Sequence, residues 1–170
     1  MSISSRTTHP LAVLAATVDS NIGTVALSLA FDVEADGWCQ LLPAGRFNAV
    51  DGRPQDVPGE QWMIDARVAQ RLIAHASLAQ NDLVIDYEHQ TLSADQNGQP
   101  APAAGWFKTM EWREGSGLWI KPQWTSRALD FIKNGEYRFL SAVFPYDKHT
   151  GEPLSLHSAA LVNRPGIDGM

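Results

Sequence analysis

Residues 83–90 join an apolar run to a group of ionisable side chains. Leu, Val and Ile are followed at once by Asp86, Glu88 and His89, which predicts a buried strand that ends in charged residues. A strand of this kind holds its last side chains rigidly at the rim of a core, and histidine is the residue most often used as a general base near neutral pH. The alternative is that Asp86 and Glu88 are solvated charges and His89 is an ordinary surface histidine.

Two further residues with chemical potential lie in apolar, β-prone segments nearer the C-terminus. Ser141 stands between Leu140 and Ala142, where a buried hydroxyl must find a hydrogen-bond partner or serve a function. Bonding to a neighbouring backbone group is the simpler interpretation of Ser141. His157 precedes Ser158 in the last apolar segment, and a lone histidine there is usually half-buried and hydrogen-bonded.

Taken together, these residues form a candidate set for nucleophilic catalysis. Ser141 would be the nucleophile, His89 its general base and His157 the group that orients the base. A serine hydroxyl is a weak nucleophile without an adjacent base, and the base needs an orienting partner. The Gly-x-Ser-x-Gly turn of the α/β-hydrolases does not occur in the sequence.

A metal site is the competing hypothesis for the same residues. Asp86, Glu88, His89 and His157 are all legitimate ligands. We expect Glu88 and His89, as neighbours on a strand, to point to opposite faces of the sheet. No His-Glu-x-x-His motif is present, so we expect no metal and no other cofactor.

The totals limit the classes of protein that fit. At 170 residues, 44% hydrophobic and 19% charged, the chain is expected to form a single globular domain over residues 11–170, after a disordered start at 1–10. The net charge of −6 and scattered Lys and Arg argue against binding of nucleic acid backbones. Cys39 is the single cysteine of the sequence, so an internal disulfide is ruled out. We expect Cys39 to be a small buried residue rather than a nucleophile. We expect no signal peptide, no transmembrane helix and a cytoplasmic location.

The elements that must position these residues are mostly strands. The apolar patterns predict a mainly β fold with a few helices, of the α+β class. The expected helices cover 63–79 and 125–135, and the expected strands cover 24–30, 38–42, 83–90, 103–112, 118–124, 137–144 and 154–162. The strands before and after the turn at 115–117 are expected to form a hairpin.

Several short motifs stand in a particular order along residues 38–170. They are Leu-Leu-Pro-Ala-Gly-Arg-Phe at 41–47, Asp-Gly-Arg at 51–53, Asp-Tyr-Glu-His-Gln at 86–90, Ala-Ala-Gly-Trp at 103–106, Gly-Leu-Trp at 117–119, Trp-Thr at 124–125, Tyr-Arg-Phe-Leu-Ser at 137–141 and Ala-Leu-Val-Asn-Arg-Pro at 160–165. In order and spacing they resemble the Mu-like prophage I proteins, which are capsid-assembly proteases of Mu-type phages. The layout is similar to that of prohead proteases and, more distantly, of herpesvirus assemblins.

The resemblance implies a fold, an activity and a place of action. The fold would be an assemblin-like, closed or nearly closed β-barrel wrapped by helices. The activity would be that of a serine endopeptidase that cleaves itself and the scaffold and major capsid proteins in the immature prohead, inside the host bacterial cytoplasm. His89 matches the family's histidine ahead of its Ala-Gly-Trp element, and Ser141 matches its serine.

The resemblance indicates the third catalytic residue and the oxyanion donors less directly than it indicates His89 and Ser141. Assemblins use a second histidine on the strand after the serine strand, which points to His157. Another alignment places Ser158 there instead, and Asp86 is the remaining candidate. Since neighbours on a strand face opposite ways, a shift of one residue decides between His157 and Ser158. The oxyanion donor would come from the backbone at Asn163 and Arg164.

The resemblance also bears on partners. Assemblins act as dimers, so the apolar face of the helix at 63–79 could serve a homodimer or simply cover the core. No nucleic acid and no membrane is expected as a partner. Members of the family continue into a helical scaffolding region, which we expect to lie outside these residues. The alternative to an enzyme is a catalytically inactive β-barrel module that serves as scaffold or binding partner in phage assembly.

Overall fold

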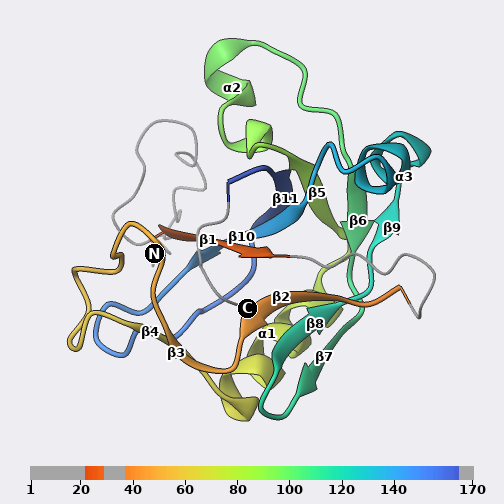
Figure 1. Ribbon diagram of the computed structural model, residues 1–170. Coiled ribbons are helices and arrows are strands. Elements are labelled where there is room, and N and C mark those ends of the chain that lie inside the picture. The colour runs from red at the N-terminus through yellow and green to blue at the C-terminus, as the bar shows by residue number, and fades with distance from the viewer. Residues whose placement is uncertain (1–21, 29–36, 165–170) are drawn as a thin grey trace, which may run out of the picture.

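The computed structural model describes residues 22–28 and 37–164, and these form an α+β fold made mostly of strands (Figure 1). The largest sheet contains six strands in the order β1-β10-β11-β5-β6-β9. Neighbouring strands are antiparallel except for β5 and β11, which are parallel. The six strands are β1 (Ile22–Ser28), β5 (Leu83–Tyr87), β6 (Gly105–Phe107), β9 (Gln123–Trp124), β10 (Phe139–Pro145) and β11 (Ser158–Val162).

Two smaller sheets complete the β-structure. A three-stranded antiparallel sheet has the order β2-β8-β7, and a two-stranded sheet pairs β3 with β4. Their strands are β2 (Cys39–Pro43), β3 (Gly45–Phe47), β4 (Trp62–Ile64), β7 (Met110–Arg113) and β8 (Gly117–Ile120). Gly117 is required in the β7–β8 hairpin, because its φ is +134° and a Cβ there would lie 2.1 Å from the carbonyl oxygen of Leu42.

Three α-helices and one short 3₁₀ helix accompany the sheets in the described ranges. α1 (Ala66–Leu78) packs against β4 and β7 through buried residues that include Val68 and Leu72. The other helices are η1 (Gln90–Leu92), α2 (Ala94–Asn97) and α3 (Ser126–Lys133). In Figure 1, η1 and α2 follow β5 at one end of the six-stranded sheet. No helix in the described part of the chain is long and apolar enough to cross a membrane.

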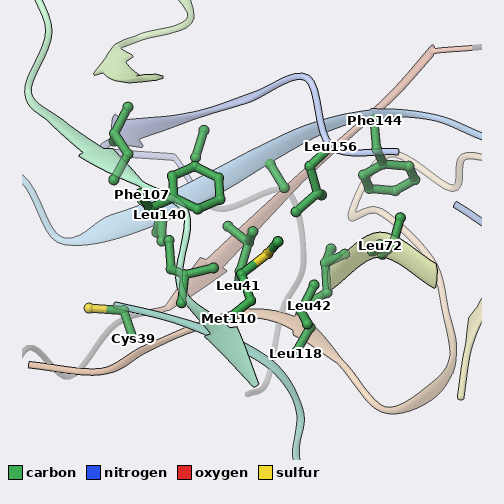
Figure 2. Packing of buried hydrophobic residues seen from close by; sticks show 14 of the residues in the cluster. Cys39, Leu41, Leu42, Leu72, Phe107, Met110, Leu118, Leu140, Phe144 and Leu156 are labelled. Carbon is green, nitrogen blue, oxygen red and sulfur yellow. The ribbon is translucent and has the colours of Figure 1, made fainter. Parts of the chain in front are cut away.

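The core lies between the six-stranded and three-stranded sheets. Figure 2 shows Leu140 of β10 and Phe107 of β6 together with Leu41 of β2 and Leu118 of β8, all fully or almost fully buried. Because side chains alternate along a strand, Ser141 must project from the other face of the sheet than Leu140. We call this second face of the six-stranded sheet, which carries Ser141, the outer face.

The expected α+β class is confirmed, and the expected closed barrel is not. The described pairings leave the six-stranded sheet open between β1 and β9. The barrel therefore stays a prediction. The expected disordered start at 1–10 lies outside the described residues.

Several predicted boundaries were wrong for local reasons. The helix predicted at 63–79 begins at Ala66. The carboxylate of Asp65 accepts a hydrogen bond from the Val68 N–H (2.8 Å) and so caps the helix there, and the apolar residues before Asp65 belong to β4. The strand predicted at 83–90 ends at Tyr87, and the strand predicted at 103–112 is two strands, β6 and β7, in different sheets. The predicted hairpin exists as β7–β8.

Candidate active site

Ser141 lies in the middle of β10, and β10 pairs with β1 on one side and with β11 on the other. Its neighbours Leu140 and Ala142 belong to the core, and its own side chain projects from the outer face. The residue is only 1% exposed. The strand therefore fixes the Ser141 hydroxyl rigidly and shields it from bulk water.

His89 reaches this hydroxyl from a turn directly after β5. Its Nε2 atom lies 2.8 Å from Ser141 Oγ. Both Glu88 and His89 have left-handed backbone conformations, with φ of 53° and 57°, which non-glycine residues adopt only at a cost of about 1–2 kcal/mol each. The Glu88 N–H donates to the carbonyl of Leu161 (3.0 Å), so the turn starts from a point anchored on β11. This strained turn brings the imidazole to Ser141.

Asp86 lies in the same row of the sheet as Ser141. Ser141 is directly opposite Ala160 on β11, and Ala160 is directly opposite Asp86 on β5. Side chains of such partners share a face, so all three belong to the outer face. Asp86 is fully buried, and its Oδ2 accepts a hydrogen bond from the Thr91 N–H (2.8 Å) at the start of η1.

Two buried polar atoms near this row have no hydrogen-bond partner among the described residues. They are Oδ1 of Asp86 and Nδ1 of His89, the ring nitrogen that does not contact Ser141. Burial lowers the pKa of His89 below its usual value, and the negative charge of Asp86 opposes this lowering. A histidine with a lowered pKa is neutral at pH 7, which is the form that accepts a proton.

His157 lies just before β11, where its half-buried ring contacts the adjacent Ser158. The distance from His157 Nδ1 to Ser158 Oγ is 3.0 Å, and the His157 N–H donates to the carbonyl of Val143. Burial lowers the pKa of His157, and the charge of Asp86 again opposes this effect. Within the described part of the chain, no hydrogen bond joins His157 or Ser158 to His89. The structure thus contains a second serine–histidine pair, and Ser158 shares the outer face with Ala160, two residues away on β11.

The predicted oxyanion segment follows β11. Asn163 and Arg164 are exposed, and the side-chain amide of Asn163 donates to the carbonyl of Glu136 (2.8 Å). The residues after Arg164 lie outside the described ranges. No donor from this segment to the Ser141 region is therefore seen within the described residues, and its role stays a prediction.

The metal hypothesis gains no support from the geometry. Within residues 22–28 and 37–164, no group of three or more His, Cys, Asp or Glu side chains could hold a metal ion. The argument from strand alternation was wrong, however, because Glu88 and His89 lie beyond the end of β5 in left-handed conformations. The buried Cys39 lies in the core, as expected.

Sequence comparison identifies the family. Residues 39–170 match the model of the N-terminal domain of the Mu-like prophage I proteins. The chain belongs to this family. The match includes Asp86, His89, Ser141 and His157, whereas β1 precedes it.

Two relatives of the Mu-like prophage I family are similar along most of this chain. Protease I of Escherichia phage Mu is 51% identical over 154 residues, which are 88% of this chain and 42% of the relative. The Mu-like prophage FluMu I protein of Haemophilus influenzae is 49% identical over 143 residues, which are 79% of this chain and 39% of the relative. The chain thus spans about two fifths of the length of these relatives. No solved structure matches it significantly.

Two features of the site in this Mu-like prophage I chain were not predicted from the sequence. Ala160 stands between Ser141 and Asp86 in the row, and its side chain is only a methyl group. Thr91 contributes only its backbone N–H to Asp86, and a backbone donor carries no signal in residue type. A small residue in the last apolar strand would have been the signal for Ala160.

Proposed function

We propose that this chain is a serine endopeptidase domain of phage head morphogenesis. The observation that carries the proposal is the 2.8 Å contact between Ser141 Oγ and His89 Nε2. In this mechanism His89 takes the hydroxyl proton as Ser141 attacks the scissile carbonyl, and it returns the proton to the leaving amine. Water then hydrolyses the acyl-enzyme by the same route.

Asp86 is the third member of the proposed site, in preference to His157 or Ser158. Its Oδ1 and the Nδ1 of His89 are both buried without partners among the described residues, and a hydrogen bond between them would satisfy both atoms. The Thr91 N–H already holds the other carboxylate oxygen in place. A carboxylate in this position fixes the tautomer of the base and stabilises its protonated form. His157 is left to pair with Ser158.

The proposed substrates and setting rest on the resemblance to capsid-assembly proteases. We propose that the enzyme cleaves itself and the scaffold and major capsid proteins within the assembling prohead, in the host bacterial cytoplasm. The name Protease I of the phage Mu relative supports a proteolytic role. The assemblin-like barrel and a homodimer belong to the same proposal.

One observation favours a second candidate, an inactive scaffold or binding module of phage assembly. Ser141 is 1% exposed, and a nucleophile must be reached by its substrate. In the enzyme, substrate would approach from the side of the half-buried His89. The two candidates differ in whether Ser141 is chemically activated.

A fluorophosphonate probe distinguishes these candidates. An activated serine forms an O–P bond with the probe, fluoride leaves and the base takes the hydroxyl proton. We expect intact-mass spectrometry to show one adduct, located on Ser141, and none in Ser141→Ala or His89→Ala. Ser158→Ala is the matched control, because Ser158 is also buried beside a histidine. An adduct on Ser158 would move the nucleophile to the second pair, and an absence of adducts would favour the inactive module.

A further inference from the structure

Trp106 lies on the same outer face of the six-stranded sheet as Ser141. Asp86 and Val84 are two residues apart on β5 and therefore share a face, and Val84 is directly opposite Trp106 on β6. Phe107, its neighbour, points the other way into the core, as Figure 2 shows. The register thus connects the nucleophile to Trp106 through Asp86 and Val84.

Trp106 is one of the few large apolar side chains exposed in the described part of the chain. It is 44% exposed in the middle of a paired strand. Its backbone position is fixed, because β9 lies so close to β6 that a Cβ on Gly105 would be 2.8 Å from the carbonyl oxygen of Gln123. Tryptophan has only two side-chain torsions, so an exposed indole on a fixed backbone costs little entropy when it binds a partner, and such residues dominate the binding energy of interfaces.

A pocket of about 210 Å³ adjoins the indole. Lys108, Lys121 and Asp82 line it together with Trp106, so its charge is positive by one unit. Lys108 is held in place by a hydrogen bond from its Nζ to the carbonyl of Ala79 (2.6 Å), whereas Lys121 is exposed. Thr109 and Gln123 add polar lining, and the Lys121 ammonium lies 5.7 Å from the centroid of the Trp38 ring. The indole and the net positive charge together fit a bulky apolar side chain that has a carboxylate next to it.

The separation between Trp106 and Ser141 suits an extended polypeptide. β6 is three strands away from β10 in the sheet, and Trp106 lies about one row of side chains beyond Asp86. With strands about 4.8 Å apart and a rise of about 3.3 Å per residue, the two Cα atoms are roughly 16 Å apart, or about five residues of extended chain. A substrate chain bound at Ser141 would reach Trp106 over about five or more residues, because it must pass around the buried Asp86 and the turn at His89.

We propose that Trp106 and the pocket beside it recognise a bulky apolar side chain, flanked by an acidic residue, about five residues from the bond that is cleaved. This subsite is a specificity determinant of the site and rests on the proposed function, but its binding can be measured without catalysis. The subsite selects polypeptides by a feature distant from the cleavage point. It would limit cleavage to extended chains that span both places.

The test uses binding in the Ser141→Ala variant, which cannot form an acyl-enzyme. A library of random twelve-residue peptides displayed on filamentous phage is selected on this variant and on Ser141→Ala/Trp106→Ala. We expect selected peptides to contain Phe, Trp, Tyr, Leu or Met beside Asp or Glu. Synthetic copies should bind the double variant about tenfold more weakly.

Three controls separate the subsite from a general loss of structure. Val50→Ala also removes exposed apolar surface, from the turn after β3, and should leave binding unchanged. Trp106→Phe should retain most of the affinity because it retains an aromatic wall. Lys121→Glu should shift selection away from acidic peptides. Equal binding by the variants with and without Trp106, or a library that yields no such peptides, would overturn the inference.

Activity then distinguishes this inference from the proposed function. On a selected peptide extended by five or more residues, Trp106→Ala should raise KM about tenfold with little change in kcat, because the contact lies far from the reacting atoms. A wild-type protein that binds the peptides through Trp106 but neither cleaves them nor reacts with the fluorophosphonate would refute the protease and keep the subsite. Cleavage with the same KM in wild type and Trp106→Ala would keep the protease and refute the subsite.

Discussion

Asp86 and Ser141 project from the same face of one sheet, in a single row with only Ala160 between them. They come from β5 and β10, which are separated in the sheet by β11. The register sets their backbones two strand spacings apart, or about 10 Å. This distance is too large for a direct contact, and it leaves space for the imidazole of His89, which contacts Ser141 from the turn after β5.

The first prediction concerns the carboxylate of Asp86. We expect Asp86→Asn to slow fluorophosphonate labelling of Ser141 on the order of 10²–10⁴-fold, because the amide neither stabilises the protonated base nor fixes its tautomer as a carboxylate does. The volume of the residue hardly changes, so the unfolding temperature should change less than the rate. Rates would be measured by intact-mass spectrometry over time.

Asp130→Asn is the control for a general effect of charge. Asp130 is exposed on α3, outside the site and the pocket beside Trp106, so its loss should leave labelling unchanged. If Asp86→Asn labels as fast as wild type while His157→Ala loses the activity, then His157 is the orienting group and the assignment of Asp86 is wrong.

The second prediction is the pH dependence of the site. Because burial lowers the pKa of His89, labelling should be constant near neutral pH and fall as the pH drops through a pKa below the usual value of about 6.5. The charge of Asp86 raises this pKa, so its removal in Asp86→Asn should move the fall to still lower pH. The measurement is the labelling rate between about pH 4 and 8.

His157 supplies the control for this profile, because burial lowers its pKa as well. If His89 is the base, His157→Ala should keep the wild-type midpoint to within about half a pH unit, with only a small change due to the altered surroundings of Asp86. A profile that disappears in His157→Ala would assign the titration to the second pair.

The sequence predicted the residue types of the site better than their arrangement. A buried strand that contains Asp86, and a serine strand at Ser141, follow from local apolar patterns, and both exist, although β5 ends at Tyr87, before His89. The parallel pairing of β5 with β11 joins segments far apart in the chain, and local patterns do not determine that register. The split of residues 103–112 between two sheets also depends on tertiary contacts.

The turn at Glu88 and His89 illustrates the remaining difficulty. Left-handed conformations are common for glycine and uncommon for glutamate and histidine, so the residue types predict a continued strand. The structure places both residues in that region, and this bend allows Asp86 and His89 to act on the same face. The backbone conformation of His89, the proposed base, is therefore the part of the site that the sequence predicts least well.

The third prediction concerns the small side chain of Ala160. Ala160→Leu should reduce labelling of Ser141 by more than about 100-fold, because the larger side chain would stand directly opposite Ser141 on the same buried face and displace the groups that contact it. The same overpacking should lower the free energy of unfolding by about 1–3 kcal/mol. Ala160→Gly removes only a methyl group and should keep most of the activity. Normal labelling of a folded Ala160→Leu protein would show that the site tolerates a large side chain opposite Ser141.

The last prediction separates the strain at Glu88 from the chemistry at His89. Glu88→Gly should raise the free energy of unfolding by about 1 kcal/mol in urea, because glycine adopts a φ of 53° without the steric cost that glutamate has there. Glu136→Gly is the matched control, since Glu136 is exposed as well but has no positive φ. Glycine at 136 should lower the free energy of unfolding by about 0.5–1 kcal/mol. A loss of stability in Glu88→Gly would mean that the glutamate side chain itself holds the turn. A gain in stability with slower labelling of Ser141 would mean that the strained turn is kept because a more flexible one presents His89 less accurately.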